Sequence, residues 1–126
     1  MKAYDPSKNP QPSDWLSTDE GERIYLVELS HRRARVRLPN RHLHATVHVI
    51  VENQLAMAVP AVTETLTRLR AGGLDRHDAI HAIGSVLAGH IYDLLEKGPA
   101  QGQVDPNVKY YDGLRNLTAA TWRKSS

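Results

Sequence analysis

The sequence predicts an all-α fold, and three observations support that prediction. Apolar residues recur every three or four positions along most of the chain, as they do on one face of a helix. Residues that begin helices, and glycines or prolines that end them, bound each of these stretches. No alternating pattern of a half-buried strand competes with this helical interpretation.

We expect a bundle of four main helices with a short C-terminal helix. The expected helices span residues 18–33, 41–58, 61–71 and 76–96, with a fifth from 106 to about 122. Residues 1–13 hold three prolines among polar residues and predict an extended or disordered arm. The remaining residues, 14–126, are enough for a single domain with one core.

Local signals set the ends of these helices. Ser17 and Glu20 match a capping box for the first helix, while Asn40 is the expected N-cap of the second. The second helix is apolar on most sides, which predicts a buried position, and Pro60 ends or kinks it. The other boundary residues are Gly72-Gly73, the N-caps Asp75 and Asp105, and Gly98-Pro99.

Composition excludes several classes of function. The chain of 126 residues has no cysteine, which rules out disulfides, iron–sulfur clusters and thiolate zinc sites. Histidines and carboxylates remain as metal ligands. No uninterrupted apolar stretch approaches about 18 residues, and the N-terminal segment lacks the apolar region of a signal peptide. We therefore expect a cytoplasmic protein without a membrane span.

Four of the seven histidines form two HxxxH pairs on separate expected helices. His44 and His48 lie on one helix, and His77 and His81 lie on another. Residues four apart share one face of a helix, so the two imidazoles of a pair can reach one cation. Each pair lies at the edge of the apolar stripe of its helix, where a half-open metal site is expected. If the two helices pack side by side, four nitrogens could converge.

Three more residues extend this set of candidate ligands. Glu52 follows His48 on the same face, and the first helix carries Glu28 and His31 at a Glu-x-x-His spacing. Ferritin-like carboxylate proteins use that spacing to direct two ligands into a bundle core. The combined set predicts a divalent metal ion, zinc or iron, and indicates no organic cofactor. A lone HxxxH pair is more often two boundary histidines bonded to backbone or carboxylates, but candidates on three helices favour a metal.

The segment His77-Asp78-Ala-Ile-His81 is similar to the HExxH motif of zinc proteases, with Asp in place of Glu. Aspartate is one methylene shorter and would place the catalytic base differently. The sequence also predicts no edge strand that could bind a peptide substrate. Both observations argue against a protease.

Three segments resemble small bacterial helical proteins that contain a domain of unknown function. They are His31-Arg-Arg, the stretch 40–56 with its HxxxH pair and following Gln54-Leu55, and the stretch 76–83 with the second pair. The resemblance covers about residues 14–95. It implies a helical fold with paired histidines and brings no established activity with it.

Three functions stay open on the sequence alone. A metalloprotein could be a hydrolase or oxidase, with Asp78 or Glu52 as base, or a metal sensor or store. An assembly module could form homo-oligomers through the apolar second helix and Trp122, with structural histidines. A nucleic-acid or phosphate binder could use the basic segment Arg32–Arg41, but the net charge of only +2 argues against it. In that third case Tyr110 and Tyr111 would stack on bases if they are exposed.

Overall fold

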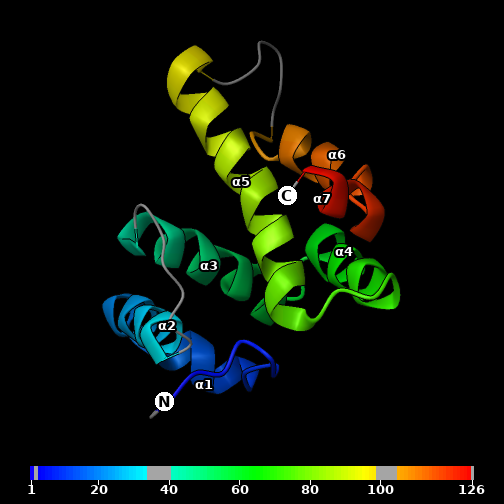
Figure 1. Ribbon diagram of the computed structural model, residues 1–126. Coiled ribbons are helices and arrows are strands. Elements are labelled where there is room, and N and C mark those ends of the chain that lie inside the picture. The colour runs from blue at the N-terminus through cyan, green and yellow to red at the C-terminus, as the bar shows by residue number, and fades with distance from the viewer. Residues whose placement is uncertain (2, 34–40, 99–104, 126) are drawn as a thin grey trace. The chain divides into compact units, whose positions relative to one another are not determined.

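A computed structural model describes residues 1, 3–33, 41–98 and 105–125 of the chain. These residues form seven helices and no strand, which confirms the all-α prediction (Figure 1). The described residues divide into two compact units, 1–59 and 60–126. The predicted bundle of four main helices is not confirmed.

The N-terminal unit contains α1 (Pro12–Ser17), α2 (Glu20–Arg33) and α3 (Arg41–Ala56). Helices α2 and α3 pack side by side, and α1 packs against α3. The two helices run antiparallel, since Arg23 contacts Asn53 and Glu28 contacts His42, and the end of α2 therefore lies next to the start of α3. The core of the unit consists of Tyr4, Trp15, Leu26, Val27, Ala45 and Val49.

The start of this unit differs from the sequence prediction. Helix α1 begins at Pro12, after Gln11, whose side chain accepts a hydrogen bond from the backbone N–H of Asp14 at 2.7 Å. Proline is favourable in the first turn because its missing N–H would have no partner there. The predicted capping box is wrong: Ser17 donates to the carbonyl of Asp14, inside α1. Asp19 instead accepts from the backbone N–H of Gly21 at the start of α2.

The predicted disorder of residues 1–13 is not confirmed either. Tyr4 is buried and its ring lies 5.3 Å from that of Trp15, while Met1 packs on the same core. Asp5 accepts a hydrogen bond from the backbone N–H of Ser7 in a turn. An aromatic anchor can hold a polar, proline-rich segment against a core even though the segment has no helical periodicity.

The C-terminal unit contains α4 (Pro60–Ala71), α5 (Arg76–Lys97), α6 (Val108–Arg115) and α7 (Ala119–Ser125). Helix α4 packs against each of the other three. Asp75 caps α5 as predicted, and α5 ends at Gly98, whose φ of 72° favours glycine. The predicted fifth helix is divided in two, because Thr118 begins a new helix by accepting from the backbone N–H of Thr121 at 3.1 Å.

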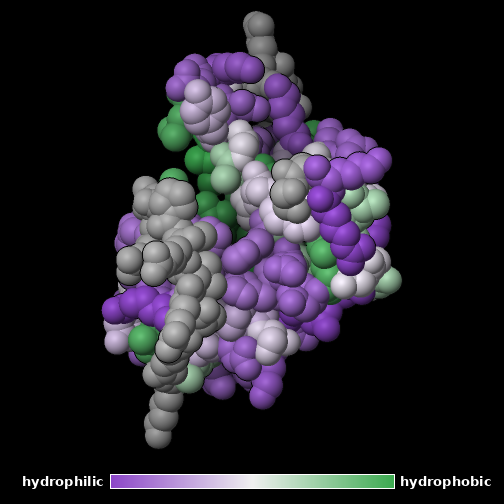
Figure 2. Space-filling view, in the orientation of Figure 1, coloured by the Kyte–Doolittle hydropathy of each residue, from purple (hydrophilic) through white to green (hydrophobic). Residues whose placement is uncertain are grey.

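Hydrophilic residues cover most of the described surface in the view of Figure 2, and apolar residues appear between them in separate places. The second predicted helix is only partly buried: Val49 and Val51 are enclosed, but Leu43 and Met57 are more than half exposed. Within the described residues, no helix by itself has the length and apolar character needed to cross a membrane.

Candidate metal centre

Helix α3 carries three candidate ligands of the N-terminal unit on one face. His44, His48 and Glu52 follow one another at intervals of four residues. The neighbouring stripe of α3, with Ala45 and Val49, packs into the core. His48 and Glu52 are therefore drawn into the interior, at 2% and 1% exposure, while His44 is half-buried.

The last turn of α2 places a third imidazole beside this face. His31 is buried, and its ring centroid lies 4.9 Å from that of His44 and 5.2 Å from that of His48. One ring nitrogen from each of these three histidines lies within 4.8 Å of the others. We call His31, His44 and His48 the histidine triad. It joins a pair that the sequence placed on one helix to a residue of another.

The triad fits a transition metal with a small adjustment. Zinc–nitrogen bonds of about 2.0–2.1 Å in a tetrahedral site place two ligand nitrogens about 3.4 Å apart. The nitrogens of the triad lie within 4.8 Å of one another. Rotations of the imidazole rings can close such a difference without moving the helices. Neutral imidazole is also a ligand that zinc and iron accept readily.

A chain of polar contacts extends from the triad to the N-terminal arm. The hydroxyl of Tyr4 donates to Oε2 of Glu52, and the phenol oxygen of Tyr4 lies 2.8 Å from Nε2 of His48. All three side chains are buried. Sequence reasoning missed Tyr4, because it lies in a polar, proline-rich stretch, 44 positions before His48, with no periodic pattern around it. The Tyr4 phenol thus links the Glu52 carboxylate to His48 of the triad.

Glu28 makes a different contact from the predicted one. Its carboxylate accepts a hydrogen bond from Nδ1 of His42 at 3.1 Å, near the exposed side of the helix pair. His31 and Glu28 thus take separate roles, although the sequence placed them in one Glu-x-x-His unit. His42 is largely exposed, in agreement with the expectation that it points away from the His44/His48 pair.

The second HxxxH pair lies in the C-terminal unit, in the first turns of α5. The rings of His77 and His81 are 4.2 Å apart, and both residues are half-buried. Asp78, the residue that resembles the protease base, is exposed, and its backbone N–H is bound by the N-cap Asp75. The pair therefore has the predicted local geometry. That both pairs share one ion stays a prediction.

The structure corrects one part of the nucleic-acid hypothesis. Tyr110 is fully buried in the C-terminal unit, where its ring stacks on that of His90, so it is not available to stack on a base. Burial raises the pKa of the Tyr110 phenol well above its ordinary value. Most of the basic segment, residues 34–40, and the expected N-cap Asn40 lie outside the described residues.

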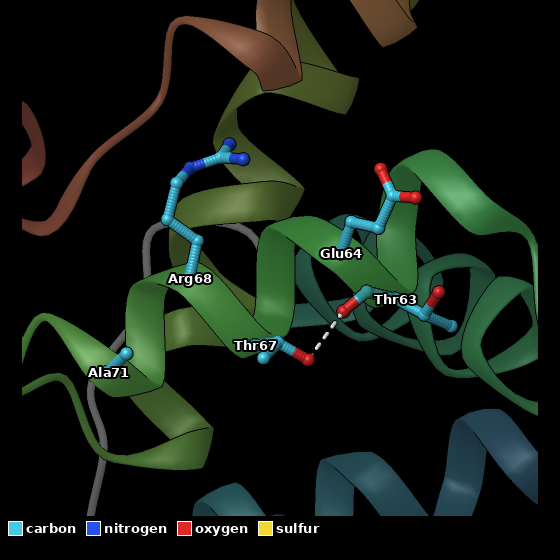
Figure 3. A pocket seen from close by; sticks show the side chains of 5 residues that line it. All are labelled: Thr63, Glu64, Thr67, Arg68 and Ala71. Atoms are coloured by element: carbon cyan, nitrogen blue, oxygen red, sulfur yellow. Dashed lines mark hydrogen bonds between the residues drawn. The ribbon is translucent and has the colours of Figure 1, made fainter.

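An open pocket of about 340 Å³ on α4 does not offer a competing site (Figure 3). Three of its four polar lining residues are hydrogen-bonded within the protein. Thr63 and Thr67 donate their hydroxyls to backbone carbonyls of their own helix. Arg68 donates to the carbonyls of Leu114 and Leu117 at the end of α6. These contacts account for Thr63, Thr67 and Arg68 without a ligand, and the remaining polar residue, Glu64, is exposed.

Comparison with family models, curated proteins and solved structures gives no match to this chain. The case for a function therefore rests on the geometry of the histidine triad.

Proposed function

We propose that the N-terminal unit binds one divalent metal ion, zinc or iron, through His31, His44 and His48. The observation that supports this most directly is the approach of three ring nitrogens, from two helices, to within 4.8 Å of one another. Three imidazoles gathered close together are costly to bury if more than one of them is protonated, since like charges repel in a low-dielectric interior. A shared cation gives the three lone pairs a common partner.

Three protein ligands leave coordination positions open on the ion. Structural zinc sites are usually closed by four protein ligands, whereas sites that bind water or a substrate keep a position free. His44 is only half-buried, unlike His31 and His48, so a solvent molecule or small ligand would approach the ion from its side. The triad is therefore suited to a metal that also binds an exogenous ligand, as in the hydrolase, oxidase and sensor hypotheses.

Titration of metal-stripped protein tests the proposal. Calorimetry with zinc should give one tight equivalent, and cobalt should give the visible absorption of a low-symmetry, nitrogen-bound ion. His44→Ala should weaken zinc binding about 100-fold or more, because it removes one of three ligands. His42→Ala is the matched control, since His42 lies on the same helix with its side chain largely exposed and paired with Glu28. No zinc or iron binding by the wild type, or equal losses in both variants, would refute the proposal.

The second HxxxH pair needs its own titration. A variant that carries both His77→Ala and His81→Ala removes the only other HxxxH pair in the sequence. If both pairs hold one ion, as the sequence predicts, zinc affinity falls in this variant. If the triad suffices, the tight equivalent is unchanged.

A further inference from the structure

The contacts of Tyr4 determine which nitrogen of His48 carries the proton. A phenol has a single proton, and Tyr4 donates it to Oε2 of Glu52. Nε2 of His48 lies 2.8 Å from the same phenol oxygen. That oxygen has no second proton to give, so the hydrogen bond requires an N–H at Nε2. A neutral imidazole protonated at Nε2 has its lone pair at Nδ1.

We infer that Tyr4 and Glu52 are positioning residues that hold His48 in the Nε2–H tautomer, so that Nδ1 is the atom it offers to the metal. The inference rests on the proposed function, because it assigns the ligand atom and the outer partners of that site. Ligating histidines commonly donate their other N–H to a carboxylate or another acceptor, which orients the ring and makes the ligand nitrogen more basic. Here the phenol of Tyr4 transmits the effect of the Glu52 carboxylate.

Because Tyr4 contacts His48, the packing of the N-terminal arm should be coupled to metal binding. Tyr4 belongs to the N-terminal arm, which is held by the packing of Tyr4 and Met1 on the core around Trp15. If packing of the arm on the core raises the metal affinity, then bound metal must favour the packed arm by the same factor. Metal binding should thus stabilise the packed conformation of the arm.

The variant Tyr4→Phe tests the inference in the full-length protein. Phenylalanine keeps the ring that packs beside Trp15 and removes only the hydroxyl, so zinc affinity should fall by about 10- to 100-fold. Tyr25→Phe is the matched control, because Tyr25 lies on α2 of the same unit and is 53% exposed. Glu52→Gln keeps an oxygen acceptor for Tyr4 without the charge, so its loss should be smaller than that of Tyr4→Phe.

A merely structural role for Tyr4 would not predict the state of the His48 ring. Long-range proton–nitrogen NMR on the metal-free wild type should show the Nε2–H tautomer of His48, and added zinc should shift the Nδ1 resonance. In Tyr4→Phe the preference for this tautomer should be lost. Zinc should also slow amide hydrogen exchange in residues 3–11 of the wild type and not of Tyr4→Phe.

The outcomes separate the inference from the proposed function. A wild type that binds no metal refutes the proposed function, while the tautomer of His48 can still be measured. If Tyr4→Phe binds zinc as tightly as the wild type does, the inference is refuted and the proposed function still stands. An Nδ1–H tautomer of His48 in the wild type refutes the inference whatever the affinities are.

Discussion

The side-chain amide of Asn53 joins all three helices of the N-terminal unit, and its removal should be costly. Its Oδ1, on α3, accepts hydrogen bonds from Nε1 of Trp15 on α1 and from Nη1 of Arg23 on α2, each at 2.8 Å. Trp15 is fully buried, so its N–H cannot turn to water when the acceptor is lost. Arg23 is half-buried, and water can replace part of its bond.

From these contacts we expect Asn53→Ala to lower the free energy of unfolding of the N-terminal unit by about 2–3 kcal/mol. A buried donor left without a partner costs about 1–3 kcal/mol, and the arginine bond adds a smaller amount because solvent replaces part of it. Asn53→Asp keeps an oxygen in the same place for both donors. We therefore expect it to cost less than about 1 kcal/mol, within the range of a mild substitution.

Fluorescence can follow the N-terminal unit alone. The chain has two tryptophans, and Trp122→Phe leaves Trp15 as the single probe. Urea unfolding of Asn53→Ala and Asn53→Asp in that background gives the two free-energy differences from the midpoint and slope. Equal losses in the two variants would show that packing of the side chain matters and not its oxygen. A loss below about 1 kcal/mol in Asn53→Ala would contradict the role of the shared acceptor.

Two further predictions concern the C-terminal unit. Burial raises the pKa of Tyr110, so above about pH 10 the unfolded state releases a proton that the folded state keeps. Stability should then fall as pH rises, by up to about 1.4 kcal/mol per pH unit, and Tyr110→Phe should remove this slope in thermal unfolding at pH 9 and 11. Arg68 donates to the carbonyls of Leu114 and Leu117, so Arg68→Lys should cost about 1–3 kcal/mol in urea unfolding. Arg70→Lys, at an exposed position of the same helix, is the control, and an equal loss there would contradict the prediction.

Helix boundaries could be predicted wherever the signal was local. Asp75 caps α5 and Gly98 ends it, as the sequence indicated, since each acts on backbone groups within four residues. The same reasoning placed the first cap at Ser17, where two helices meet within three residues and Asp19 is the residue that caps α2. Several polar residues in a row offered equivalent caps, and only the packing of α1 through Trp15 decided between them.

The two HxxxH pairs, with which the candidate site began, are a property of the sequence itself. Residues four apart share a helical face whatever the helix packs against, so the pairing of His44 with His48 could be predicted from spacing. The tertiary structure decided the rest of the triad. It brought His31 from α2 to that face, paired Glu28 with His42, and placed Tyr4 between Glu52 and His48. These choices depend on which helix faces meet and on where an irregular arm is held. Helical periodicity describes one element at a time and carries no information on either.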